Sequence, residues 1–292
     1  MRLLNLAKIG YNELVVADEV ITTEELLPLV GTDHVRLIDA REPDAYQEGH
    51  IPGAVNLHPS ALDHTEIRDH GEEVDHQLRP ASEIVVYFRA AGVRSDVPVC
   101  VYDDGGGYLA SRLWWVLDYL GHPRRRLLDG GFFAWTTAGG TLSVGAVSIS
   151  DGGFTQRPSF PRRLEFSDVI TNMGDPGMVL CNTLAADAFR VESIPGSINI
   201  PYTDTFAPDN LPLLKSRHEL ESVFARHGVT HRHRLVCYCQ IGYSASQVYF
   251  AARYAGLTNV TVYDGSMADW VARGGELVPG NPDRPGRIPP GG

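Results

Sequence analysis

The sequence predicts an α/β protein built from two tandem copies of one domain. One observation is an internal repeat: residues 98–142, shifted by 135 positions, align without a gap onto the segment that ends at Leu277. Upstream, "HIPGAVNLH" (50–58) matches "SIPGSINIP" (193–201) at an offset of 143. The other observation is that short apolar runs alternate with segments of helical periodicity. Each copy is therefore expected to hold a mostly parallel sheet with helices on both faces.

The strands and helices follow from runs that recur in both copies. Strands are predicted for "VRLIDA", "VPVCVY" and "RRLLD" in the first copy, and for "GMVLCN", "RLVCYC" and "VTVYDG" in the second. Helices are predicted for "YLASRLWWVLDYLG" and "YSASQVYFAARYAG", because each ends in a glycine suited to a helix C-terminus. The offset changes by eight residues within "DHTEIRDHGEEVDHQ" (63–77), which we expect to be a surface loop.

The repeat also sets the domain boundaries. We expect an N-terminal domain over 1–142 and a C-terminal domain over 164–280. The intervening segment 143–163 is rich in glycine, proline and serine, which is typical of a linker. Residues 281–292, "NPDRPGRIPPGG", are predicted to form a flexible tail.

Composition excludes several classes of function. The chain has 292 residues and a formal net charge of −11, which argues against a nucleic-acid or anionic-membrane binder. It has no apolar run of about 18 residues, as a membrane span requires, and its N-terminus does not read as a signal peptide. The 4 cysteines are too few for a disulfide scaffold, and C-Y-C is a poor zinc site. We therefore expect no metal and a reduced, cytoplasmic compartment.

Cys239 is the candidate nucleophile. It ends the strand "RLVCYC" and precedes a helix that begins near Ala245, at the edge where open α/β sheets bind ligands. The unpaired N–H groups and the dipole of a helix start favour a thiolate there, and Gly242 allows the loop to close around the sulfur. The remaining cysteines lie inside apolar strands and are interpreted as inert core residues: Cys100, Cys181 and Cys237.

These segments resemble the tandem-domain rhodanese family of sulfurtransferases over nearly the whole chain. The resemblance rests on "LIDAREPDAYQEGHIPGAVNLH", on "YDGSMADWVARGGELV" and on the Cys-x-x-Gly-x-Ser loop after a strand. It implies a catalytically silent N-terminal domain and a C-terminal domain in which Cys239 becomes a persulfide. It further implies a monomer with no metal or organic cofactor, a small sulfur donor, and cyanide or a thiol as acceptor. The backbone amides expected to cradle the sulfur belong to Gln240, Ile241, Gly242, Tyr243 and Ser244.

The sister copy carries a carboxylate where the second copy has its thiol. The offset of 135 places Asp104 opposite Cys239. We expect Asp104 to mark the silent site and to cap the following helix.

The residues that select the donor depart from the family pattern. Thiosulfate-specific members usually have basic residues where this chain has Gln240 and Ile241, and mercaptopyruvate-specific members usually have a hydroxyl that Ile241 lacks. The second copy also lacks the family's Asp-x-Arg, because Asn182 and Leu184 replace those residues.

We therefore expect part of the anion recognition to come from elsewhere, since the family's active site faces the domain interface. The candidate contacts are Arg41, His50, Arg112 and Arg190. Two of them also have a structural interpretation: Arg41 as the partner of Asp39, and His50 as a residue that orders its turn.

Three functions remain open at this point. The main hypothesis is a sulfurtransferase that uses thiosulfate or a related donor, and a 3-mercaptopyruvate sulfurtransferase is an alternative. A non-enzymatic persulfide carrier would instead accept one sulfur on Cys239 and stall without a partner protein. A cysteine phosphatase is disfavoured, because "QIGYSASQ" lacks the arginine that would bind phosphate.

Overall fold

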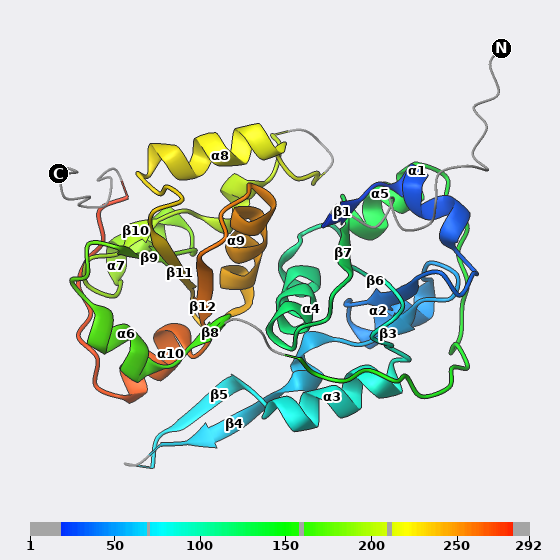
Figure 1. The fold of residues 1–292 in the computed structure, drawn as a ribbon, viewed down its shortest axis with the longest axis horizontal. Helices are drawn as coiled ribbons and strands as arrows, with labels where there is room; N and C mark the ends of the chain where they lie inside the picture. The colour runs from blue at the N-terminus through cyan, green and yellow to red at the C-terminus, as the bar shows by residue number, and fades with distance from the viewer. Residues whose placement is uncertain (1–18, 69–70, 158–160, 209–211, 283–292) are drawn as a thin grey trace.

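The computed structural model describes residues 19–68, 71–157, 161–208 and 212–282. Two domains lie side by side, and each is centred on a parallel sheet of five strands (Figure 1). The predicted fold class is therefore confirmed. Most of the predicted tail (281–292) lies outside the described residues.

The two sheets share one strand order. In the first domain the order is β1-β7-β6-β2-β3 and in the second it is β8-β12-β11-β9-β10. The first sheet comprises β1 (Val20–Ile21), β2 (Arg36–Asp39), β3 (Val55–Asn56), β6 (Val99–Tyr102) and β7 (Arg125–Leu128). The second comprises β8 (Arg163–Leu164), β9 (Met178–Asn182), β10 (Ile198–Asn199), β11 (Arg234–Tyr238) and β12 (Val260–Tyr263).

Helices cover both faces of each sheet. The first domain has α1 (Thr23–Leu26), η2 (Leu27–Leu29), α2 (Pro43–Glu48), η3 (Pro59–Leu62), α3 (Ala81–Ala90), α4 (Tyr108–Tyr119) and α5 (Gly131–Thr137). The second has α6 (Phe166–Asn172), α7 (Ala186–Val191), η4 (Tyr202–Thr205), α8 (Arg217–Arg226), α9 (Tyr243–Tyr254) and α10 (Ser266–Ala272). Alternate strand residues enter different cores: Val101 joins the core shared by both domains, whereas Cys100 joins the outer core of the first domain.

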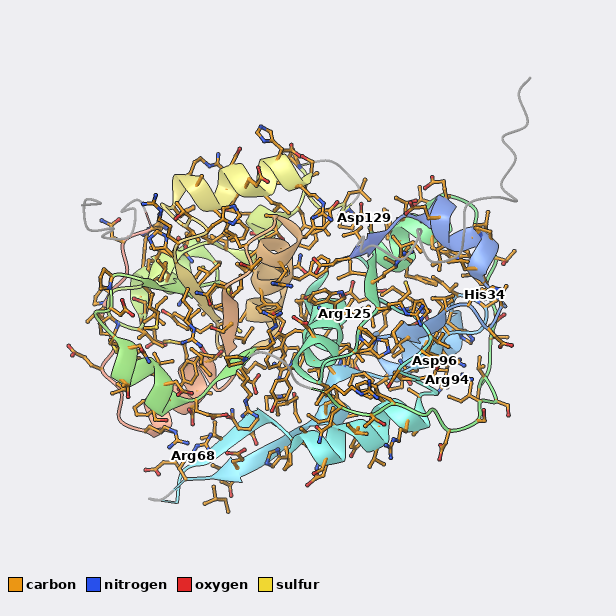
Figure 2. The ribbon with its side chains drawn as sticks, viewed as in Figure 1. His34, Arg68, Arg94, Asp96, Arg125 and Asp129 are labelled. Carbon is orange, nitrogen blue, oxygen red and sulfur yellow. The ribbon has the colours of Figure 1, made fainter. Side chains whose placement is uncertain are left out.

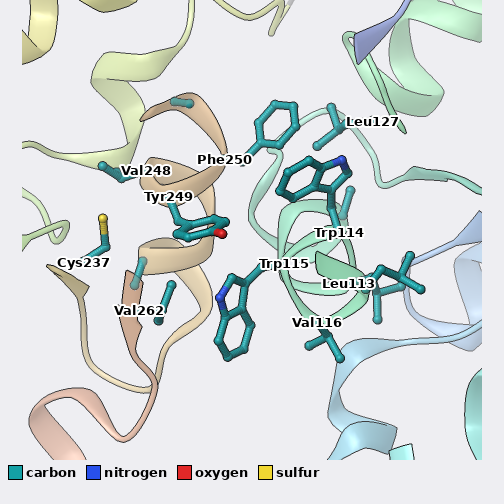
Figure 3. Packing of buried hydrophobic residues seen from close by; sticks show 14 of the residues in the cluster. Leu113, Trp114, Trp115, Val116, Leu127, Cys237, Val248, Tyr249, Phe250 and Val262 are labelled. Atoms are coloured by element: carbon teal, nitrogen blue, oxygen red, sulfur yellow. The ribbon is translucent and has the colours of Figure 1, made fainter. Parts of the chain in front are cut away.

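The two domains meet along α4 and α9, and the contact is aromatic (Figure 3). Trp114 of α4 packs edge-on against Phe250 of α9, with ring centroids 4.8 Å apart. Because these side chains belong to one continuous buried cluster with strand residues of both sheets, the domains share a hydrophobic core.

The segment 63–77 differs from the expected surface loop. It forms an antiparallel hairpin of β4 (Asp63–Ile67) and β5 (Glu73–Leu78) that reaches the second domain (Figure 1). Arg68 Nη2 lies 2.5 Å from Asp269 Oδ1 of α10 (Figure 2). The insertion that was expected to form a surface loop instead forms an ordered connection between the domains.

The predicted linker also makes specific contacts with the first domain. Ser143 pairs with His50 in an isolated antiparallel bridge. Phe154 is buried and packs edge-on against Phe88 of α3. Arg163, the last residue of the predicted linker, begins β8.

The described residues contain neither a membrane-spanning helix nor a candidate metal cluster. None of their helices is long and apolar enough to cross a membrane. No cluster of three or more histidine, cysteine, aspartate or glutamate side chains in this part of the chain has the arrangement of a metal site.

Candidate active site

Cys239 lies between the end of β11 and the start of α9. Gly242 precedes the helix with φ of 90°, a left-handed conformation that favours glycine. Its N–H donates a hydrogen bond to Cys239 Sγ at 3.0 Å. The cysteine is 2% exposed. The loop therefore turns a backbone donor at a helix N-terminus onto the sulfur, an arrangement that favours negative charge there.

The first turn of α10 forms hydrogen bonds with the backbone of the Cys239 loop. The Cys239 N–H donates to Ser266 Oγ at 3.1 Å, and the Cys239 carbonyl accepts from the Met267 N–H at 3.0 Å. The Gln240 carbonyl accepts from the Ala268 N–H at 3.1 Å. Three hydrogen bonds thus fix the loop backbone without engaging the sulfur.

The remaining predicted loop residues differ in exposure. Gln240 is exposed and Ile241 is half-buried, so neither brings a charge to the sulfur. Ser244 is half-buried, and its hydroxyl lies 3.0 Å from the hydroxyl of Thr183. Tyr243 is buried and points away from the loop toward the first domain, where its hydroxyl donates to Asp63 Oδ2 at 2.6 Å.

The other cysteines are buried inside strands. Cys237 is paired in register with Cys181 of the neighbouring strand β9. Burial raises the pKa of the Cys237 thiol, and burial likewise raises the pKa of Cys100 to about 12. These thiols are therefore protonated at neutral pH.

The counterpart of Cys239 in the first domain is Asp103, so the prediction of Asp104 was wrong. Sheet register decides this, because Tyr102 pairs with Asp39 as Tyr238 pairs with Asn182. Asp103 follows its strand as Cys239 does. The silent loop contains one residue more than the catalytic loop, "DDGGG" against "CQIG", and the gapless alignment concealed this insertion.

Asp103 fills its own loop with a carboxylate. It is buried and accepts four backbone N–H bonds of 2.9 to 3.2 Å. The donors are Gly105, Gly107, Leu109 and Ala110. Asp104 instead points outward, 74% exposed, with Oδ1 3.7 Å from Arg41 Nη1.

A segment of the second domain covers the silent loop. Phe206, Pro212 and Leu214 line the small cavity beside it. The Leu214 N–H donates to Asp129 Oδ1 at 2.9 Å, at the end of β7 (Figure 2). Residues of the second domain thus pack beside the Asp103 loop and hydrogen-bond to its domain.

Two of the four predicted interface contacts are structural. Arg41 is buried within the first domain, where its Nη2 lies 2.6 Å from Asp39 Oδ2, and its guanidinium lies 3.6 Å from the ring centre of Phe132. His50 is buried and stacks on Tyr46, with centroids 4.0 Å apart. Their contacts agree with the structural interpretation of each residue: Arg41 pairs with Asp39, and His50 packs at the "HIPG" turn.

The other two predicted contacts differ from each other. Arg190 is half exposed on α7 and lies 2.5 Å from Asp187, one turn earlier on the same helix. Arg112 crosses from α4 to the second domain and forms an ion pair with Asp264. The structure therefore brings one of the four, Arg112, to the base of the catalytic loop.

Sequence reasoning missed three residues beside Arg112. Asp63 Oδ1 lies 3.4 Å from Arg112 Nη2, and His76 Nδ1 lies 3.5 Å from Asp63 Oδ2. His76 is nearly half exposed and has φ of 57°, a conformation uncommon outside glycine. Asp264 belongs to the repeat, opposite Asp129, and this match was the one available signal. Asp63 and His76 lie in the insertion, for which the repeat offers no counterpart.

Comparison with known proteins agrees with this geometry. The model of the rhodanese-like domain matches residues 22–138 and again residues 165–273. The chain belongs to the rhodanese family. The putative thiosulfate sulfurtransferase SseB of Mycobacterium tuberculosis is 33% identical over 270 residues, which cover 86% of this chain and 93% of that protein.

Other similar proteins carry a different substrate in their names. The 3-mercaptopyruvate sulfurtransferase of Escherichia coli is 29% identical, with 84% of this chain and 92% of that protein covered. The human 3-mercaptopyruvate sulfurtransferase is 31% identical, covering 85% and 82%. The crystal structure of SseA from Escherichia coli matches with a TM-score of 0.75 at 27% identity, covering 86% of this chain and 99% of that chain. Together these relatives support a sulfurtransferase of the rhodanese family.

Proposed function

We propose that this protein moves a sulfane sulfur from a small donor to cyanide or a thiol, through a persulfide on Cys239. The observation that carries the proposal is the hydrogen bond from the Gly242 N–H to the sulfur at the start of α9. It supports a nucleophilic role because a thiolate, and then a persulfide anion, needs such a donor.

The proposed reaction has two displacement steps. The Cys239 thiolate attacks the outer sulfur of thiosulfate, the bond between the two donor sulfurs breaks, and sulfite leaves with the electron pair. The acceptor then attacks the outer sulfur of the persulfide, and Cys239 departs as a thiolate. With cyanide the product is thiocyanate, and no external oxidant or reductant is consumed.

Thiosulfate is the proposed donor, and 3-mercaptopyruvate is the second candidate. The relative from Mycobacterium tuberculosis and the absence of a hydroxyl at Ile241 favour thiosulfate. The names of the relatives from Escherichia coli and human favour mercaptopyruvate. Because Gln240 and Ile241 are uncharged, we infer that neither donor is held by a basic loop.

Tandem mass spectrometry, which assigns the added sulfur to one cysteine, separates these possibilities. The protein is incubated with thiosulfate or with 3-mercaptopyruvate, and the Cys239-containing peptide is then analysed. The expected result is a gain of one sulfur on Cys239, removal of that sulfur by cyanide, and no gain in Cys239→Ser. Sulfur on Cys237, or no added sulfur with either donor, would contradict the proposal.

Steady-state kinetics then test whether the protein is an enzyme or a carrier. An enzyme shows saturable production of thiocyanate over many turnovers, and the preferred donor has the larger kcat/KM. A single turnover per Cys239 with both donors would favour the persulfide carrier.

A further inference from the structure

Arg112 is a buried charge supplied by the silent domain. Its side chain is 1% exposed, although it lies where two domains meet. The guanidinium pairs with Asp264 of the second domain and lies 3.4 Å from Asp63 of the hairpin. It is also 4.9 Å from the ring centre of Trp115 and 5.1 Å from that of Tyr243.

This ion pair adjoins the backbone that binds the sulfur. A Cβ placed on Gly242 would lie 3.0 Å from Arg112 Nη1 and 2.8 Å from Asp264 Oδ1. Gly242 is the residue whose N–H donates to Cys239 Sγ. Arg112 and Asp264 therefore stand directly behind the donor of the catalytic loop.

The silent loop has the same arrangement without the charge. Gln247 occupies the position on α9 that Arg112 occupies on α4 in the repeat. A Cβ placed on Gly107 would lie 2.9 Å from Gln247 Oε1, and Gln247 Nε2 donates to Thr205 Oγ1 at 3.1 Å. In each half, the side chain at this helix position lies beside the loop glycine of the other domain: Arg112 beside Gly242, and Gln247 beside Gly107. Only Gly242 therefore has a cation next to it.

We propose that Arg112 is a positioning residue for the sulfur site: it neutralises Asp63 and Asp264 behind Gly242, so that the N-terminus of α9 presents a positive field to Cys239. Without Arg112, two buried carboxylates would oppose a thiolate or persulfide anion. The proposal rests on the proposed function in taking Cys239 as the reactive residue.

The charges around this group support the assignment. Burial acts to lower the pKa of Arg112, but Asp264 and Asp63 outweigh it and raise the pKa, so the guanidinium stays charged. Arg163 Nε lies 3.5 Å from Asp264 Oδ2, and His76 Nδ1 lies 3.5 Å from Asp63 Oδ2. Arg163 Nε also lies 3.2 Å from Glu165 Oε1. Arg163 and His76 thus each face one of the pair Asp63 and Asp264, whereas Arg112 contacts both.

Two titratable neighbours of the loop, Tyr243 and Cys237, are uncharged at neutral pH. Tyr243 donates its hydroxyl to Asp63, and burial followed by Asp63 raises the pKa of Tyr243. The neighbouring thiol of Cys237 is protonated, because burial raises its pKa. Changing Arg112 therefore changes the balance of charge at the loop more than any titration of these neighbours does.

The test is the pH profile of alkylation of Cys239 by iodoacetamide, measured on its peptide by mass spectrometry. In Arg112→Gln, which copies the silent half, we expect the midpoint of the profile to rise by about one pH unit and the rate at pH 7 to fall about tenfold. In Arg112→Gln/Asp264→Asn, the midpoint is expected to return most of the way toward that of the unmodified protein. If Arg112→Gln instead raised the midpoint by disrupting the packing of the loop, adding Asp264→Asn would not restore it.

Gln247→Ala is the matched control, because it perturbs the same helix interface without altering charge; its midpoint is expected to stay unchanged. A folded Arg112→Gln with an unchanged midpoint, or an equal shift in Gln247→Ala, would overturn the proposal. If Arg112→Gln fails to fold, Arg112→Lys takes its place: it retains the charge and should keep the midpoint, and a shift of about one unit would overturn the proposal. Alkylation needs no sulfur donor. Failure to form a persulfide would therefore contradict the proposed function but would leave this test of Arg112 valid.

Discussion

After β6 the chain enters α4 through residues 103–107, and after β11 it enters α9 through residues 239–242. Both loops end in a left-handed glycine, and both turn backbone N–H groups onto the side chain of their first residue. In the first, Asp103 takes four N–H donors and leaves no free position. In the second, one residue fewer brings a single donor to a sulfur. The comparison teaches that a loop's own side chain can take up the backbone donors that the other loop leaves for a ligand.

The largest expected effect comes from moving the thiol to the silent loop. Cys239→Ser should reduce thiocyanate production by at least about a thousandfold, and adding Asp103→Cys should not restore it. The silent loop is longer, and Pro212 and Leu214 cover the position where a donor would bind. The measurement is thiocyanate formation from thiosulfate and cyanide. Recovery to more than about one per cent would show that the loops are interchangeable.

A pair of glycine substitutions separates catalysis from stability. Gly242→Ala and Gly107→Ala both place a side chain at φ of 78° to 90°, which should destabilise the fold by about 1–2 kcal/mol. Gly242→Ala should also lower kcat/KM by about a hundredfold, because its Cβ displaces Asp264 or the loop.

Gly107→Ala should leave kcat/KM within about twofold, since its Cβ contacts Phe206 and Gln247 at the silent loop. Urea denaturation and steady-state kinetics measure the two effects. Equal losses of activity in both variants would contradict the division of roles between the loops.

Cys239 should differ in reactivity from the cysteines that lie inside strands. At pH 8 we expect Cys239 to react with iodoacetamide at least about a hundredfold faster than Cys237 or Cys100. Burial keeps those thiols protonated and raises the pKa of Cys100 to about 12. Peptide mapping during a time course tests this, and unfolding the protein in guanidinium should make the rates equal. Rapid labelling of Cys237 in the native protein would count against Cys239 as the nucleophile.

The smallest expected effect concerns stability against pH. His122 is buried where the second domain has Leu257, and burial lowers the pKa of His122 below that of the unfolded chain. The unfolded chain therefore takes up the proton first, so this contribution to stability is present above about pH 6.5 and is lost as the pH falls below that value. His122→Leu should have a smaller difference in the urea midpoint between pH 7.5 and pH 5.5. If the difference in urea midpoint between the two pH values is the same in His122→Leu as in the unmodified protein, His122 is not the cause of the pH dependence.

The fold and the candidate nucleophile follow from the sequence because both rest on local patterns. Apolar runs, helical periodicity and a cysteine between a strand and a glycine-containing loop are visible in "RLVCYCQIGYSASQ". The identity of the silent residue is not local. It depends on strand register, and the pairing of Tyr102 with Asp39 shifts the answer from Asp104 to Asp103.

Contacts across the domain interface were predictable only in part. Arg112 was one of four arginine and histidine candidates, and its reach depends on how α4 lies against α9. Arg41 fulfils its local interpretation, because the Asp-x-Arg spacing lets it close onto Asp39 within its own domain. The hairpin escaped prediction because its polar residues carry a weak strand pattern, and its role lies in contacts with a sheet far along the chain.

The hairpin and Arg112 have a consequence for how such a duplicated chain can change over time. The first half, which has Asp103 where the second has Cys239, contributes Asp63 and Arg112 beneath the Cys239 loop, and Leu214 of the second half contacts it in return. Each half therefore depends on the other for parts that it cannot itself encode. Deleting the first copy would remove side chains that pack beneath the Cys239 loop of the second, so the duplication cannot be reversed by simple loss.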